Sequence, residues 1–204
     1  MVHSFSVLLV LGTLFYYSQA QNAAQEVKTQ VPKCNLWQGK CPPGWKTFIR
    51  PPGVRICLKI INQNATYLEA QNICRKQYNS RIHGIENKEE HNWVKMKSRL
   101  VIKQGASFMW VGARRKSWCY KTEAQLKTDD KCKSGLNSFE WDDQLTDGSY
   151  LFTQWDKTIS APEGIMSNNA PEDCVVMNVH EGDAPIDDKD CSLPQAGVLC
   201  GMTA

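Results

Sequence analysis

The sequence lacks the local patterns that mark common catalytic sites. It contains no Gly-x-Ser-x-Gly turn, which exposes the nucleophile of many hydrolases, and no His-Glu-x-x-His helix, which holds zinc in many proteases. His83, His91 and His180 form no sequence cluster with a cysteine or serine that would pair a base with a nucleophile. We therefore expect that the protein is not an enzyme.

The sequence also lacks a dominant sign of charge. Lysine and arginine number 24 against 21 aspartate and glutamate residues, and the basic residues are scattered along the chain. Nucleic-acid binding normally requires clustered basic residues, as does electrostatic binding to a membrane surface. We therefore expect neither kind of partner.

Long apolar runs are missing beyond the first twenty residues. Residues 5–17 form an uncharged apolar run of about 13 residues, shorter than the roughly 18 needed to span a bilayer. Ser18-Gln19-Ala20 follows, and its small first and third residues suit signal peptidase. We therefore predict a cleaved signal peptide over residues 1–20, secretion to the extracellular space, and no membrane anchor.

Cysteine, by contrast, is abundant. All nine cysteines follow residue 20, and an exported chain meets an oxidising compartment, so we expect disulfides. A zinc site is the competing interpretation, which the absence of any Cys-x-x-Cys pair disfavours. The odd count leaves at least one thiol without an internal partner. The cysteines are Cys34, Cys41, Cys57, Cys74, Cys119, Cys132, Cys174, Cys191 and Cys200.

Two amphipathic helices are predicted in the first half of the chain. Thr66 and Glu69 have the spacing of a capping box, and the apolar residues after them share one face, which predicts a helix over residues 66–78. Asn87 and Glu90 have weaker cap spacing before a second set of apolar residues at helical intervals. Short apolar runs bounded by Gly, Pro, Asp or Ser then predict strands over residues 108–113, 174–179 and 196–200.

Two segments show no regular periodicity. Residues 21–40 are polar, and we interpret them as an extended N-terminal segment. Residues 114–171 contain Gly, Asp, Ser, Asn and Pro throughout, so much of this stretch must be loop. A loop region this long, with four cysteines in it or just beyond it, favours an ordered functional surface.

Seven short motifs follow one another along the chain from Cys41. They are Cys41-Pro42-Pro43-Gly44-Trp45 with Phe48 and Cys57, Tyr67-x-x-Ala70 with Cys74, Trp110-Val111-Gly112-Ala113, Phe139-x-Trp141, Asp147-Gly148-Ser149 with Trp155, Glu172-Asp173-Cys174-Val175, and Cys191 to Leu199-Cys200. Each motif is weak by itself, but their order makes the match specific. Over about residues 41–201 the chain resembles the C-type lectin-like domain.

The resemblance implies an α+β fold over residues 41–204, in which two helices flank small antiparallel sheets and a long loop region. It further implies the disulfides Cys41–Cys57, Cys74–Cys200 and Cys174–Cys191, with Cys119 and Cys132 left to close a local hairpin. Spacing alone does not determine this connectivity. Cys34 then has no assigned mate, and we hypothesise that it forms an intermolecular disulfide in a homodimer, with a small-thiol cap as the alternative.

Sugar-binding members of this family hold calcium with oxygen ligands from the long loop and the following strand. Asp187 and Asp188 keep the oxygen-bearing positions of the last ligand motif, although Ile186 replaces its tryptophan, and Glu172 stands where an intervening acid belongs. The expected Glu-Pro-Asn or Gln-Pro-Asp triplet is missing, because Gly164-Ile165-Met166 occupies its place. These three side chains offer no oxygen to calcium.

Two interpretations of these acids stay open. In the first, Glu163, Asn168 or Asn169 supplies further oxygens to a rearranged calcium site. In the second, Glu172, Asp187 and Asp188 are solvated or hydrogen-bonded loop residues with no metal. The second is favoured, because a calcium site needs convergent geometry as well as the right atoms. We therefore expect no cofactor, with calcium as the alternative.

Other residues admit two interpretations as well. Trp110, Trp141 and Trp155 could stack on sugar rings, but aromatic residues more often pack in a core. Asn64-Ala65-Thr66 is the only Asn-x-Ser/Thr sequon, and in an exported chain we expect Asn64 to accept a glycan unless the sequon goes unused.

The sequence thus predicts a secreted recognition module that binds a glycan or an extracellular protein through its long-loop face. The usual calcium-dependent mode is not expected, and secreted lectin-like proteins suggest a role in innate defence. The alternative is a structural or matrix protein with no glycan ligand, in which Cys34 links chains during assembly.

Overall fold

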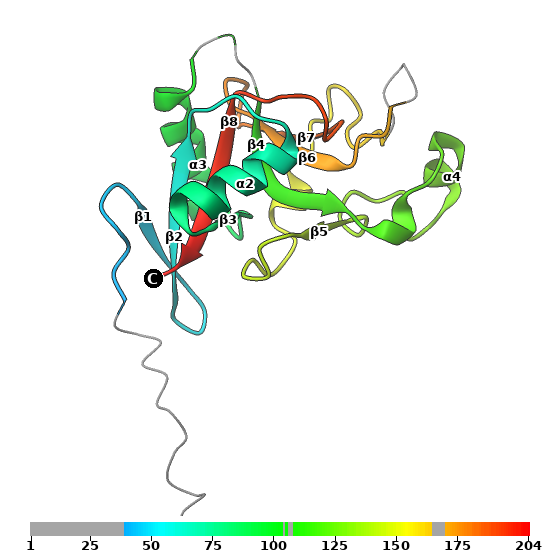
Figure 1. Cartoon of the computed structure of the whole chain (residues 1–204). Helices are drawn as coiled ribbons and strands as arrows, with labels where there is room; N and C mark the ends of the chain where they lie inside the picture. The colour runs from blue at the N-terminus through cyan, green and yellow to red at the C-terminus, as the bar shows by residue number, and fades with distance from the viewer. Residues whose placement is uncertain (1–38, 104, 106–107, 165–169) are drawn as a thin grey trace, which may run out of the picture. The chain divides into compact units, whose positions relative to one another are not determined.

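The computed structural model describes residues 39–103, 105, 108–164 and 170–204 (Figure 1). The predicted signal peptide and nearly all of the predicted N-terminal extension lie outside this part, as do Cys34, Asn168 and Asn169. Among the described helices, none has the length and apolar character needed to cross a bilayer.

Both predicted helices form where their capping residues lie. Helix α2 (Tyr67–Tyr78) follows Thr66, whose side chain accepts a hydrogen bond from the Glu69 backbone while the Glu69 carboxylate accepts one from the Thr66 backbone. Helix α3 (Lys88–Val101) follows Asn87, whose side chain accepts from the Glu90 backbone. These bonds, reciprocal at α2 and one-sided at α3, satisfy amides that the first turn of a helix leaves unpaired.

A shorter helix, α4 (Glu123–Thr128), interrupts the stretch that the sequence suggested to be mostly loop. It begins with the same chemistry, because Thr122 and Gln125 form a capping box. Two single turns of 3-10 helix, η1 (Ser117–Cys119) and η2 (Leu151–Thr153), lie in the same stretch. The region is therefore more regular than its composition indicates.

The described strands join into one sheet, whereas the resemblance implied small antiparallel sheets. Strand order is β1-β2-β8-β4-β6-β7, with β3 added to β8 and β5 added to β4. Strand β4 makes this continuity, because it pairs parallel with β8 and antiparallel with β6 and β5. The strands are β1 (Lys46–Arg50), β2 (Val54–Ile61), β3 (Arg81–Ile82), β4 (Phe108–Arg115), β5 (Phe139–Trp141), β6 (Cys174–Asn178), β7 (Ile186–Lys189) and β8 (Gly197–Thr203).

Alternate residues of the central strands point into two different cores. In β4, Met109 and Val111 belong to the core cluster that contains Val94 of α3, whereas Trp110 belongs to the cluster that contains the buried face of α2. Successive side chains of a strand point to opposite faces of its sheet. Helices α2 and α3 therefore pack on opposite faces, as Figure 1 allows the reader to follow.

Four disulfides fasten this framework, and they join the same pairs that the resemblance implies. They are Cys41–Cys57, Cys74–Cys200, Cys119–Cys132 and Cys174–Cys191. The bond between Cys74 and Cys200 ties α2 to the last strand across 126 residues of chain. Cys174–Cys191 ties the start of β6 to the residues just after β7.

Replacing both Cys74 and Cys200 by alanine is expected to destabilise the protein more than replacing both Cys41 and Cys57. The chain-entropy model gives losses of about 5 and about 3 kcal/mol, because the two bonds close loops of very different length. Urea unfolding of the two double variants measures both free energies. Equal losses, or the reverse order, would contradict the assignment of Cys74–Cys200 as the main covalent constraint.

Candidate functional site

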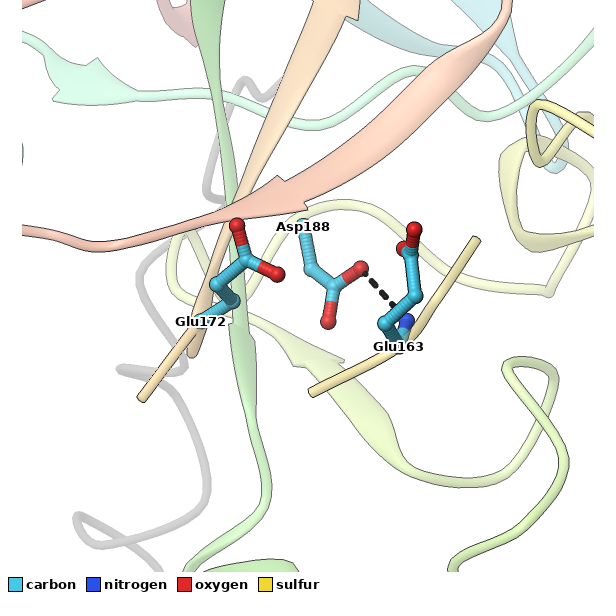
Figure 2. A group of neighbouring side chains, drawn as sticks. All are labelled: Glu163, Glu172 and Asp188. Carbon is cyan, nitrogen blue, oxygen red and sulfur yellow. Dashed lines mark hydrogen bonds between the residues drawn. The ribbon is translucent and has the colours of Figure 1, made fainter. Parts of the chain in front are cut away.

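Three carboxylates from distant parts of the chain meet beside β7. Glu163 comes from the long loop, Glu172 from the residues before β6, and Asp188 from β7 itself. One oxygen of each lies within 4.8 Å of the others. Figure 2 shows Asp188 between the two glutamates, with its hydrogen bond to the Glu163 backbone.

Asp188 is completely buried and has a partner for each of its oxygens. Oδ1 accepts from the Glu163 amide at 3.1 Å. Oδ2 accepts from the Gly164 amide at 2.8 Å and from Nη2 of Arg115 at 2.7 Å. The Asp188 carboxylate therefore binds the base of the long loop on one side and the end of β4 on the other.

Arg115 is the buried cation of this arrangement. Its Nε donates to the Asp173 carboxylate at 3.0 Å, and its Nη2 also donates to the Glu172 backbone oxygen at 3.1 Å. The guanidinium carbon lies 4.5 Å from the centre of the Phe139 ring. A guanidinium presents several donors in one plane, so a single side chain can bind two carboxylates and a carbonyl at once.

Gly164 allows the loop to approach this closely. Its amide donates to Asp188, and its carbonyl accepts from the Glu172 amide at 3.0 Å. Its φ is +83°, and a Cβ atom there would lie 2.4 Å from Leu126 and 3.1 Å from Arg115 Nη2. Only glycine adopts this left-handed conformation without strain and also lacks the Cβ atom, for which there is little room here.

Lys189 is the second cation of the site. Because residues two apart on a strand point to the same face, Lys189 lies beside Asp187, and the two form an ion pair. Its Nζ lies 3.7 Å from the Glu172 carboxylate and 5.5 Å from the centre of the Phe108 ring. Burial alone would lower the pKa of Lys189, but the carboxylates of Asp187 and Glu172 raise it above its ordinary value.

Burial dominates the titration of the acids. It raises the pKa of Glu172 to about 7 against the opposing effect of Lys189, and it raises the pKa of Asp188 to about 7 against that of Arg115. Burial also raises the pKa of Glu163, Asp173 and Asp187. The site therefore contains acids whose negative charge is costly and is balanced by the protein's own cations.

The described residues do not fit the calcium that the fold suggests. Calcium takes six to eight oxygen ligands, whereas only three carboxylates of the described chain converge here. Both oxygens of Asp188 already accept hydrogen bonds, and Arg115 contacts one of them directly. Glu163 Oε2 and both oxygens of Asp187 are buried without a hydrogen-bond partner. Asp187 forms an ion pair with Lys189, so Glu163 Oε2 is the oxygen that remains free to bind a cation.

The sequence-predicted site residues are thus only partly brought together. Glu163, Glu172 and Asp188 converge, whereas Asp187 pairs with Lys189 instead. Asn168 and Asn169 lie outside the described residues. Trp110 is fully buried in the core on the α2 side, and Trp141 and Trp155 are partly buried against the core on the α3 side, as core packing predicts.

Sequence reasoning missed Arg115 and Lys189. Lys189 follows the two aspartates directly, so strand alternation could have paired it with Asp187. Arg115 lies two residues beyond the Trp110–Ala113 motif, and nothing local connects it to Asp188, 73 residues away.

Glu172→Gln is expected to stabilise the protein at alkaline pH. Because the folded pKa of Glu172 is raised from 4.5 to about 7, the folded state keeps a proton that the unfolded state releases, so the free energy of unfolding falls as pH rises between these values. The variant cannot lose this contribution, and its advantage should reach about 1–3 kcal/mol at pH 8 and vanish near pH 5.

Urea unfolding at the two pH values measures the effect. The matched control is Glu140→Gln, which removes the same charge at an exposed position of β5 and should show no such pH-dependent gain. A Glu172→Gln variant less stable than the wild type at pH 8 would show that the carboxylate contributes favourably when charged.

The fold is similar to that of several solved structures. The carbohydrate-recognition domain of cow CD23, solved in the presence of GlcNAc2Man3 oligosaccharide, is 18% identical with a TM-score of 0.52, and the match covers 81% of this chain and 97% of that one. The C-type lectin CEL-I from Cucumaria echinata is 20% identical with a TM-score of 0.55, and the match covers 80% of this chain and 97% of that one. A Ca2+-dependent type II antifreeze protein in its Ca2+-free form is 21% identical with a TM-score of 0.51, and the match covers 80% of this chain and 100% of that one.

At these identities the structural similarity shows the fold alone. A search among curated protein sequences finds no match. A profile of the family described as C-type lectin domain-containing protein 141/158 matches residues 53–203, which is well over half of the chain. The chain therefore belongs to this family of C-type lectin domain proteins.

Proposed function

We propose that the protein is a secreted recognition module whose domain, residues 41–204, binds a carbohydrate or an extracellular protein without calcium. The binding surface is the long-loop face, by which we mean the surface carried by residues 154–164 and 170–173. The domain class supports a recognition role, since the C-type lectin-like fold characterises a family of recognition domains. A role in innate defence is a further part of this proposal.

The observation that carries the calcium-independent mode is the position of Arg115. Its guanidinium contacts Asp188, the acid that would be a central calcium ligand, and lies within hydrogen-bonding distance of Asp173 as well. Lys189 neutralises Asp187 and approaches Glu172 in the same way. A divalent cation would have to displace or repel both side chains, which are largely buried.

The same contacts supply a reason for an ordered binding surface. In calcium-binding sites the ion itself organises loops, because one cation collects oxygens from several segments. Here the Asp188 carboxylate accepts hydrogen bonds from the Glu163 and Gly164 amides. The Arg115 guanidinium donates to the Asp173 carboxylate and to the Glu172 carbonyl. The base of the long loop is therefore held by hydrogen bonds that need no metal.

Calcium titration combined with a glycan array tests this proposal. The wild type is expected to give no heat of calcium binding, and any glycan or protein ligand captured on the array should bind equally in calcium and in chelator. Asp188→Ala tests the site, and Asp183→Ala, at an exposed aspartate outside the site, is the matched control. A clear calcium heat that Asp188→Ala abolishes and Asp183→Ala keeps would contradict the proposal.

The alternative function is assembly, in which the domain is a structural or matrix protein and Cys34 links chains.

We propose the Cys34 disulfide within the recognition function as well, together with a glycan on Asn64, whose exposed position before α2 leaves it accessible. Non-reducing electrophoresis should show a dimer that disappears with reductant and with Cys34→Ser, and a glycosidase should lower the mass. A monomer under both conditions, or an unchanged mass, would reject the corresponding modification.

A further inference from the structure

An open cavity of about 680 Å³, lined by both polar and apolar groups, lies on the α2 side of the sheet. Its walls come from α2, from Asn79–Ile82 including β3, from Asp142–Leu145 after β5, and from Gly201–Thr203 at the end of β8. Its lining includes none of the acids or cations of the long-loop site. Its volume falls within the range of pockets that hold small molecules in other proteins.

The carboxylates of this cavity are already bound within the protein. Asp142 accepts from the Tyr67 hydroxyl, the Gln71 amide and Nε of Arg114, each at 2.8–2.9 Å. Asp143 is completely buried and accepts from the backbone amides of Gly84, Leu145 and Thr146. Arg114 therefore balances the charge of Asp142, whereas Asp143 keeps a negative charge that is buried and stabilised by these amides.

The arginines of the cavity, in contrast, keep most of their donors. Arg75, in the last turn of α2, donates through Nη2 to the Asn72 side-chain oxygen at 2.8 Å. Arg81, in β3, donates through Nη1 to the Asp143 backbone oxygen at 3.0 Å and to the Gln144 side-chain oxygen at 3.2 Å. All three acceptors are neutral, and within the described part of the chain neither guanidinium forms an ion pair.

The rest of the lining suits a polar ligand of moderate size. Gln71 and Gln144 place amide groups in the wall, and Leu68, which is 67% exposed, contributes an apolar edge. A guanidinium binds planar or tetrahedral oxyanions through parallel N–H donors, and it does so more strongly than it binds a neutral hydroxyl. A hydroxyl-rich ligand with one anionic group matches this combination.

We propose that the cavity is a second binding site, which takes a small acidic saccharide whose carboxylate or sulfate is bound by Arg75 and Arg81. The site is independent of the long-loop face and of calcium. Its polar hydrogen-bonding groups hold the sugar ring, and the two guanidinium groups select for negative charge. Neutral sugars of the same size bind weakly, because they leave both cations without a charged partner.

Calorimetric titration of the complete secreted protein with glucuronate, glucose 6-sulfate, glucose and inorganic sulfate tests the site. Saturable binding is expected for the two acidic sugars, with weaker binding at higher salt. Arg75→Gln and Arg81→Gln should each weaken it by roughly tenfold or more, as the loss of a charge-assisted hydrogen bond predicts. The matched control is Lys76→Gln, which removes one positive charge from the same turn of α2 outside the cavity lining.

Each other outcome decides against the proposal. Equal affinity in Arg75→Gln and Lys76→Gln would reduce the effect to general charge, and glucose binding as tightly as glucuronate would remove the role of the anion. Inorganic sulfate binding as tightly as glucose 6-sulfate would overturn the assignment to a saccharide. No saturable binding of either acidic sugar at millimolar concentration, by protein whose unfolding transition is normal, would eliminate the site.

Discussion

The buried ion pair between Arg115 and Asp188 connects three parts of the molecule that the chain order keeps apart. Arg115 ends β4, Asp188 lies in β7, and the amides of Glu163 and Gly164 bring the long loop to the same carboxylate. Burying two charges is expensive even when they are paired, so the pair is weak evidence for high stability. Removing only one member of the pair is strongly destabilising, because the remaining charge would be buried without a partner.

This constraint is the basis of the proposal that the site works without calcium. The acids of β7 are kept, and Arg115 and Lys189 pair with them. The hydrogen bonds that hold the loop then come from backbone amides and one guanidinium, which are permanent parts of the chain. Under the proposed function, recognition on this face depends on the shape and polarity of the loop and not on metal-bound hydroxyl groups.

Alternation along β4 distributes two neighbouring arginines to two surfaces. Arg115 points toward the long-loop acids, and Arg114 points toward Asp142, which lines the cavity on the α2 face. By binding Asp142, Arg114 balances one negative charge of that cavity, so that Arg75 and Arg81 outnumber the remaining buried carboxylate of Asp143. One strand thus shapes the electrostatics of both proposed binding surfaces.

Local chemistry made part of this structure predictable. The caps at Thr66 and Asn87 marked the start of α2 and α3, and the ordered motifs implied the family and the cysteine pairs. The single sheet was not foreseen, because the pairing of β4 with both β6 and β8 depends on residues about 60 to 90 positions apart. The position of Arg115 was missed for the same reason, since long-range contacts leave no local pattern.

The most direct test of this account is a double-mutant cycle in the free energy of unfolding, measured in chelator with Arg115→Met, Asp188→Asn and the combined variant. If the pair holds the loop base without metal, each single change should cost about 2–5 kcal/mol, and the combined change should cost clearly less than their sum. Additive costs would contradict the account, because they would show that Arg115 and Asp188 stabilise the fold independently of each other.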